Sequence, residues 1–161
     1  MREVRSISRG RIPPFVPAFE AKADAATLEM LRKVPIFIGL SDRQLKHLAK
    51  DSMGRRYSDG DTIVKQGDEG IAFFLILDGR AEVRRKGKRL AGLGPGDFFG
   101  EMALFDDEPR SADVVATQPT SCLVLSKWEF WGFAMKEPKM LRGMLGEMAR
   151  RLSNSNRALS E

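Results

Sequence analysis

Between residues 53 and 126 apolar residues recur at every second position in short segments, and this pattern constrains the fold more than any other feature. Side chains of a β-strand alternate between two faces, so a two-residue period predicts strands. The expected strands are residues 54–57, 62–65, 72–78, 81–86, 89–93, 112–116 and 122–126. Turn sequences separate them, among them Asp78-Gly79 and Gly94-Pro95-Gly96-Asp97. Many short strands at regular spacing indicate an antiparallel roll, barrel or sandwich.

Helical patterns flank the strand region on both sides. Residues 24–33 predict a first helix, and Ser41 with Gln44 three positions later forms a capping box that begins a second. After the strands, a capping box at residues 126–129 begins a third helix, and Pro138 suits the first position of a fourth. The predicted fold class is therefore α+β: an antiparallel roll, barrel or sandwich flanked by N-terminal and C-terminal helices.

The chain reads as one domain preceded by an arm. Its 161 residues are enough for a single core. Residues 1–22 are rich in Arg and Pro and show no hydrophobic period, so we expect an irregular N-terminal arm. Residues 23–161 form the domain, with a helical lead-in at 23–52, the roll at 53–126 and C-terminal helices at 127–157.

The scarcity of cysteine and histidine excludes several classes of site. Cys122 is the only cysteine and His47 the only histidine, so a disulfide within the chain, a Cys-rich zinc site and most His-based catalytic groups are excluded. A single cysteine also suits a reducing compartment, so we predict a cytoplasmic protein. The longest apolar run, residues 71–77, is too short to span a membrane. We predict no metal site, no catalytic residue and no enzymatic activity.

One segment, residues 93–112, reads neither as an ordinary strand nor as an ordinary helix. It carries Glu101 and Arg110 beside small residues, Gly100 and Ala103, that let the backbone approach a ligand closely. A guanidinium clasps a phosphate with two charge-assisted hydrogen bonds, and a carboxylate accepts a hydrogen bond from a ribose hydroxyl. Arg110 and Glu101 therefore fit the two ends of one sugar phosphate, with a structural ion pair between them as the alternative.

The order of residues in this segment resembles that of a known family. Residues 95–104 read Pro-Gly-Asp-Phe-Phe-Gly-Glu-Met-Ala-Leu, and Arg110-Ser111-Ala112 follows at a gap of 9 positions from Glu101. This pattern resembles the phosphate-binding cassette of the cyclic-nucleotide-binding domain family, found in bacterial catabolite activators, regulatory subunits of cAMP-dependent kinase and gated channels. The resemblance covers residues 31–157. It implies an antiparallel eight-stranded β-roll, jelly-roll-like, that binds cAMP, with cGMP as the second candidate and no other cofactor.

The resemblance also implies roles for individual residues. It assigns the phosphate to Arg110 and to backbone amides near Gly100, Met102, Ala103 and Ala112. It assigns the ribose hydroxyl to Glu101. The base would lie against Leu90, Ala91 and Leu93. Ser111 stands where relatives that accept cGMP often have Thr and those that favour cAMP have Ala, so it leaves the two ligands open.

The final helix carries the apolar stripe Leu141, Leu145, Met148 and Leu152, which we expect to pack first of all against the roll, while Met140 and Met144 begin a second apolar face. The second face hints at a parallel homodimer through this helix. In dimeric relatives a hydroxyl of this helix reaches the base, which points to Ser155 and Asn156. In monomeric relatives an arginine caps the base, which points to Arg151.

The family also implies a switch in which ligand binding moves the last helices over the base. Catabolite-activator relatives continue into a helix-turn-helix, whereas this sequence stops at Glu161. We therefore expect no direct DNA-binding domain here and a separate effector protein, or else a chain that is a fragment of something longer. The rival hypothesis is a cassette domain that has lost its ligand and serves as a protein-interaction scaffold.

Overall fold

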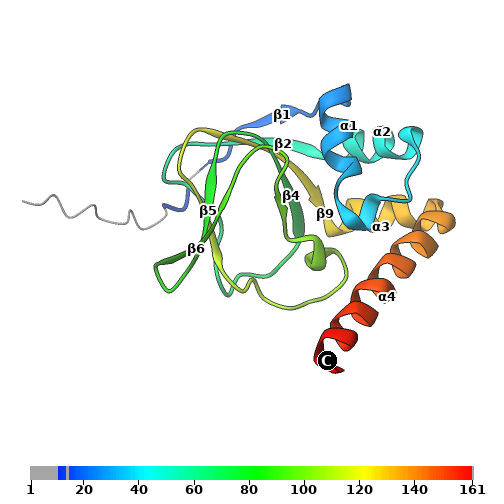
Figure 1. The fold of residues 1–161 in the computed structure, drawn as a ribbon. Helices are drawn as coiled ribbons and strands as arrows, with labels where there is room; N and C mark the ends of the chain where they lie inside the picture. The colour runs from blue at the N-terminus through cyan, green and yellow to red at the C-terminus, as the bar shows by residue number, and fades with distance from the viewer. Residues whose placement is uncertain (1–10, 14, 161) are drawn as a thin grey trace, which may run out of the picture.

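The computed structural model describes residues 11–13 and 15–160, and these form a β-roll with a layer of helices on one side (Figure 1). The helices of this part of the chain are α1 (Ala25–Arg32), η1 (Pro35–Phe37), α2 (Asp42–Asp51), η2 (Glu101–Leu104), α3 (Lys127–Lys136) and α4 (Pro138–Ser160). The strands are β1 (Ala18–Glu20), β2 (Met53–Tyr57), β3 (Thr62–Val64), β4 (Ala72–Asp78), β5 (Ala81–Arg85), β6 (Lys88–Leu93), β7 (Phe98–Phe99), β8 (Asp113–Ala116) and β9 (Thr120–Ser126).

The strands pair antiparallel in two sheets, and this confirms the predicted α+β class and the roll. One sheet has the order β1-β2-β9-β4-β7 and the other β3-β8-β5-β6. The strand β4, Ala72–Asp78, has the predicted bounds. The hairpin of β5 and β6 lies at the edge of the second sheet, with the turn residues Lys86 and Gly87 at positive φ.

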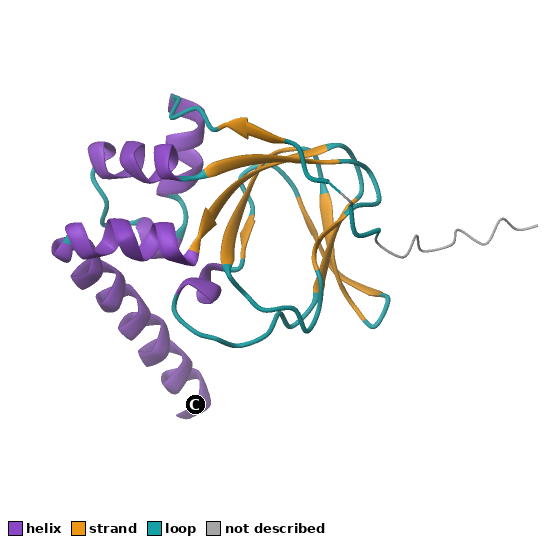
Figure 2. Cartoon of the chain, turned by 180° about the vertical axis from the view of Figure 1, so that it is seen from behind, coloured by secondary structure: helices purple, strands orange, loops and turns teal. Residues whose placement is uncertain are grey.

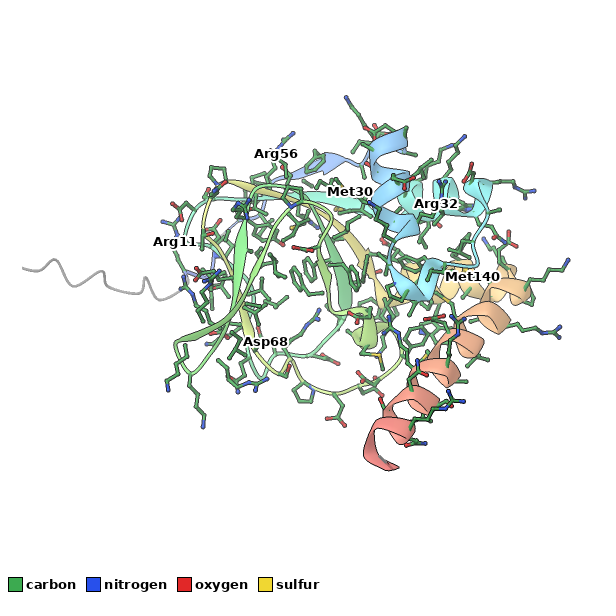
Figure 3. All side chains as sticks on the ribbon, viewed as in Figure 1. Arg11, Met30, Arg32, Arg56, Asp68 and Met140 are labelled. Atoms are coloured by element: carbon green, nitrogen blue, oxygen red, sulfur yellow. The ribbon has the colours of Figure 1, made fainter. Side chains whose placement is uncertain are left out.

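Two strands were not predicted, and one of them corrects the expectation of an irregular arm. Residues 18–20 form β1, which pairs with β2 so that Phe19 lies opposite Gly54. A side chain at position 54 would overlap the Phe19 ring, so glycine makes this pairing possible. Arg11 also ties the arm to the roll, with its Nη2 3.1 Å from the buried Asp61 carboxylate, on the far side from Met140 (Figure 3). The second unpredicted strand, β7, is only two residues long and pairs with β4.

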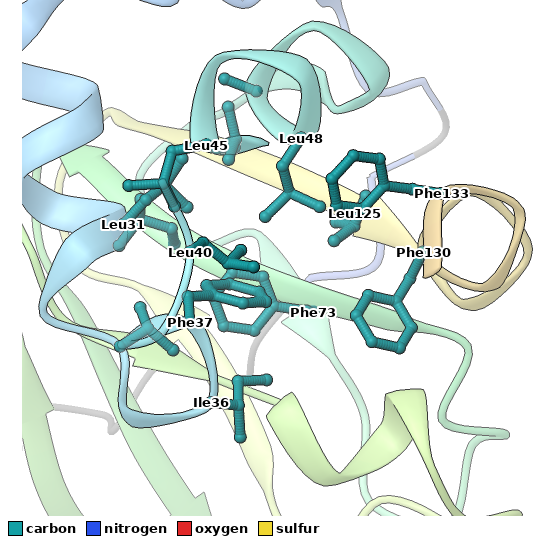
Figure 4. Close-up of a cluster of buried hydrophobic side chains, with 14 of the residues drawn as sticks. Leu31, Ile36, Phe37, Leu40, Leu45, Leu48, Phe73, Leu125, Phe130 and Phe133 are labelled. Carbon is teal, nitrogen blue, oxygen red and sulfur yellow. The ribbon is translucent and has the colours of Figure 1, made fainter. Parts of the chain in front are cut away.

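The helices and the first sheet enclose the larger of two hydrophobic clusters (Figure 4). Phe37, Phe73 and Phe130 are fully buried there, with the Phe37 and Phe73 rings edge-to-face at 5.5 Å. Each such side chain contributes about 1.5–3 kcal/mol by leaving water. The predicted capping box at the start of α2 is confirmed, since Gln44 N donates to Ser41 Oγ at 3.2 Å and Ser41 N to Gln44 Oε1 at 2.9 Å. A second cluster fills the interior of the roll.

The last helix packs on a different face from the one expected. Met140 and Met144 are buried in the helical cluster, at 3% and 2% exposure, whereas Leu145 and Leu152 are each 65% exposed. The prediction that this stripe packs against the roll is therefore wrong for Leu145 and Leu152, whereas Leu141 does pack against the larger hydrophobic cluster. The reason is that α4 contacts η1 and follows α3, and then descends diagonally past η2, outside the two sheets (Figure 2). Among the helices of the described residues, none combines the length and hydropathy that crossing a bilayer requires.

Candidate functional site

The cassette segment leaves β7 through a left-handed residue, Gly100, whose φ is 80°. The turn then winds into η2, drawn in light green between the roll and α4 in Figure 1. A Cβ at position 100 would collide with Nη1 of Arg110 and lie 2.8 Å from the Ala72 carbonyl oxygen. Position 100 therefore requires glycine for two reasons: its left-handed backbone conformation and the space that the Arg110 guanidinium occupies.

Two backbone hydrogen bonds hold Arg110 in place. Its N–H donates to the Asp68 carbonyl oxygen at 2.8 Å, and its carbonyl oxygen accepts from Gly67 N at 2.8 Å. The guanidinium donates from Nη2 to the Ala72 carbonyl oxygen and lies 5.7 Å from the centre of the Phe74 ring. Burial lowers the pKa of Arg110, while the nearby Asp106 carboxylate raises it. The side chain is thus a fixed, half-buried cation.

Glu101 does not pair with Arg110. Its Oε1 lies 3.9 Å from Nη1 of Arg151 on α4, and Arg151 also reaches Glu147 at 4.0 Å. Within residues 11–13 and 15–160, no carboxylate lies within 4.0 Å of the Arg110 guanidinium. The alternative of a structural ion pair between Glu101 and Arg110 is therefore wrong, and Arg110 keeps donors for a bound anion.

A pocket of about 340 Å³ lies between this segment and the roll. Seven predicted site residues line it: Gly100, Glu101, Met102, Ala103, Arg110, Ser111 and Ala112. Sequence reasoning missed the other lining residues: the apolar Val64, Val83, Phe99, Pro109 and Val114, and the acidic Asp106 and Glu108. Strand alternation carries a signal for two of the valines, because Val83 shares a strand face with the buried Ala81 and Val114 with Ala116.

Other predicted residues lie outside the pocket lining. Leu90 is 53% exposed on the edge strand β6, where Ala91 is exposed too, and Leu93 packs against the interior cluster of the roll. Ser155 and Asn156 are exposed on α4. The roles of these five residues at the base stay predictions. Arg151, the third candidate on α4, reaches the cassette through Glu101.

The cassette is joined to α3 by polar and aromatic contacts. The indole Nε1 of Trp131 donates to the Leu104 carbonyl oxygen at 2.7 Å. Lys127 Nζ donates to the Asp106 carbonyl oxygen at 2.6 Å and to the Asp107 carboxylate at 2.7 Å. Phe105 packs edge-to-face on Trp131, with ring centres 6.1 Å apart. These contacts join η2 and the loop after it to the helix that leads into α4.

Comparison with known proteins identifies the family. The family model described as "Cyclic nucleotide-binding domain" matches residues 54–137, slightly more than half of the chain. The chain belongs to this family. The match spans the roll, the cassette and α3, and it confirms the resemblance found in the sequence. The family is defined by binding of a regulatory ligand and not by catalysis.

Three relatives show how far the similarity extends. A cGMP-dependent protein kinase of Plasmodium berghei is 41% identical over 88 residues, which cover 55% of this chain and 10% of the kinase. A cyclic AMP receptor protein of Thermus thermophilus is 32% identical over 127 residues, 76% of this chain and 59% of the receptor. The N-terminal domain of a Streptomyces coelicolor transcriptional regulator has a TM-score of 0.77 at 30% identity and covers 82% of this chain and 95% of that domain.

Proposed function

We propose that this chain binds a cyclic nucleotide, cAMP in the first place and cGMP as the alternative, in the pocket beside η2. The observation that carries the proposal is the state of Arg110, a half-buried guanidinium that lines the pocket and has no carboxylate within 4.0 Å in the described residues. A half-buried cation that no carboxylate contacts is costly, and a phosphate diester supplies a direct partner for it.

The other cassette groups suit the rest of a sugar phosphate. Backbone amides around Gly100 and Met102 lie at the pocket wall and suit phosphate oxygens. The Glu101 carboxylate suits the ribose 2′-hydroxyl as a hydrogen-bond acceptor. This carboxylate lies 3.9 Å from Arg151 Nη1. A ribose at Glu101 therefore alters the contact that holds α4 near the cassette, which supports the proposed switch of the C-terminal helices.

The choice between the two nucleotides turns on one residue in the lining. Ser111 lies at the pocket wall, and its carbonyl oxygen accepts from Arg85 Nε at 3.1 Å. Its hydroxyl offers both a donor and an acceptor. The relatives include a cGMP-dependent kinase and a cyclic AMP receptor, so their names alone leave the base open. We retain cAMP as the first candidate.

The proposed role is that of a cytoplasmic sensor that acts on a separate effector and is not itself an enzyme. The exposed Leu145 and Leu152 on α4 support a partner surface there, either a second copy of the chain or the effector. The competing function is a scaffold that binds no nucleotide. The scaffold hypothesis predicts no response of the protein to any nucleotide, which makes the two functions separable in one assay.

The test is a titration of the wild-type protein with cAMP, cGMP and 5′-AMP. Calorimetry measures the affinity for each nucleotide, and thermal unfolding measures the stabilisation that each one gives. Ligand at one hundred times its Kd is expected to stabilise the protein by about 2.7 kcal/mol. Linear 5′-AMP is expected to bind at least about tenfold more weakly than cAMP, or about 1.4 kcal/mol. Absence of any shift with both cyclic nucleotides would favour the scaffold.

Arg110→Ala is expected to weaken cAMP binding by about two to three and a half decades, because loss of a buried paired charge costs about 3–5 kcal/mol. Arg56→Ala is the matched control. Arg56 also lies over a phenylalanine ring, with its guanidinium 4.5 Å from the centre of Phe19, but it stands outside the pocket lining. Equal cAMP affinities for wild type and Arg110→Ala in calorimetry would refute the assignment.

A further inference from the structure

The pocket proposed to bind an anion is lined by more negative than positive charge. Its charged lining residues within the described part of the chain are Glu101, Asp106, Glu108 and Arg110, that is, three carboxylates and one guanidinium. Arg151 offsets Glu101 from outside the lining, at 3.9 Å. Glu108 is exposed to solvent, which screens its charge. Asp106 is the remaining carboxylate, and it is half-buried.

Asp106 is fixed in place on several sides. Its N–H donates to the Met102 carbonyl oxygen at 3.0 Å, and its carbonyl oxygen accepts from Lys127 Nζ at 2.6 Å. Its carboxylate Oδ1 accepts from Glu108 N at 3.4 Å. The carboxylate also acts on the Arg110 guanidinium electrostatically, since it raises the pKa that burial lowers. A bound phosphate at Arg110 must therefore lie in the field of a carboxylate that is held in position.

We propose that Asp106 restricts this pocket to phosphates that carry a single negative charge. The inference rests on the proposed function and adds a specificity-determining residue to it. Arg110 neutralises one negative charge of a bound phosphate. A second charge on the same phosphate finds no further cation in the described lining, and the half-buried Asp106 belongs to the same lining.

The two kinds of phosphate differ in this charge. A cyclic phosphodiester carries one negative charge, whereas a phosphate monoester carries about 1.5 to 2 near neutral pH. Two like unit charges about 8 Å apart, at an effective dielectric constant of about 40, repel by about 1 kcal/mol, which is about fivefold in affinity. The pocket would thus discriminate against linear nucleotides and inorganic phosphate by charge as well as by shape.

The experiment separates charge from ring closure with two linear probes. Adenosine 5′-monophosphate and its phosphate methyl ester share the base, the ribose and an open phosphate, but the ester carries one charge. Wild type is expected to prefer the ester, and Asp106→Asn is expected to reduce that preference about fivefold. Asp59→Asn is the matched control, because Asp59 is exposed and lies outside the lining, and its replacement removes the same charge.

The titrations of wild type and the Asp106 variants distinguish failure of the charge inference from failure of the proposed function. Thermal unfolding of each variant checks folding, and Asp106→Ser removes the same charge if Asp106→Asn does not fold. An unchanged preference in a folded Asp106 variant overturns the inference. An equal change in Asp59→Asn also overturns it, because the effect would then follow net charge and not the pocket. Failure of wild type to bind cAMP refutes the proposed function instead, so the two failures are distinguishable.

Discussion

Replacement of Gly100 by alanine tests the geometry of the cassette more directly than any change of a charged residue. Gly100 has a φ of 80°, and a Cβ there would collide with Arg110 Nη1 and lie 2.8 Å from the Ala72 carbonyl oxygen. Two costs therefore add. The left-handed conformation costs an alanine about 1–2 kcal/mol. Displacement of the guanidinium from the Ala72 carbonyl costs a further charged hydrogen bond, about 1.5–3 kcal/mol.

The matched control for this change is Gly87→Ala. Gly87 has a φ of 77° in the β5–β6 turn, and no atom outside its neighbours lies within 4 Å of the position of its Cβ. Its replacement therefore carries the conformational cost and not the crowding. We expect Gly87→Ala to lower the free energy of unfolding by about 1–2 kcal/mol and Gly100→Ala to lower it by about 2.5–5 kcal/mol.

Urea unfolding, monitored by circular dichroism, gives the free energy of unfolding of both variants. Calorimetry gives their affinity for cAMP. Gly100→Ala is expected to lose most of its cAMP affinity, because its Arg110 is displaced, whereas Gly87→Ala is expected to bind as wild type does. Equal losses of stability in the two variants, or wild-type binding by Gly100→Ala, would show that the glycine makes no room for Arg110 and would refute the reasoning.

Two further predictions concern regions outside the pocket. Leu152→Glu places a charge on the exposed α4 stripe, so we expect monomers in light scattering and weakened nucleotide binding in calorimetry. Asn154→Glu, at another exposed position of α4, is the control and is expected to change neither property. A wild type that is monomeric at high micromolar concentration, with and without nucleotide, would contradict the homodimer. Burial raises the pKa of the Cys122 thiol from 9.0 to about 12. The thiol therefore ionises at lower pH in the unfolded chain than in the folded one, which favours unfolding. We expect the urea concentration at the unfolding midpoint to fall as pH rises from about 9 toward 12. Cys122→Ala removes this contribution, and an identical pH slope in that variant would contradict it.

The parts of the fold that the sequence predicted are those set by local patterns. The bounds of β4 follow from a run of apolar residues between turn sequences, and the capping box of Ser41 and Gln44 lies within four residues. The strand β1 has three residues and no period, and its partner Gly54 is distant in the chain. The buried face of α4 depends on where η1 lies, since Met140 and Leu145 are equally apolar in sequence.

The same distinction holds for the site. Seven pocket residues were predicted because the cassette is nearly continuous in sequence, from Gly100 to Ala112. Val64 and Val83 line the pocket from separate strands, so only the closed roll brings them there. Glu101 and Arg151 are 50 positions apart, and their 3.9 Å contact depends on the course of α4.

The hydrogen bond between α3 and the cassette gives this protein an optical reporter of its own. The sequence has two tryptophans, and they lie three positions apart on α3. Trp128 is 67% exposed, whereas Trp131 is half-buried and donates its indole N–H to the Leu104 carbonyl oxygen. Any displacement of η2 relative to α3 must lengthen this bond and change the polarity around one indole while the other stays in water. The emission spectrum of the unlabelled protein, with Trp128→Phe to remove the background, thus follows the cassette in real time.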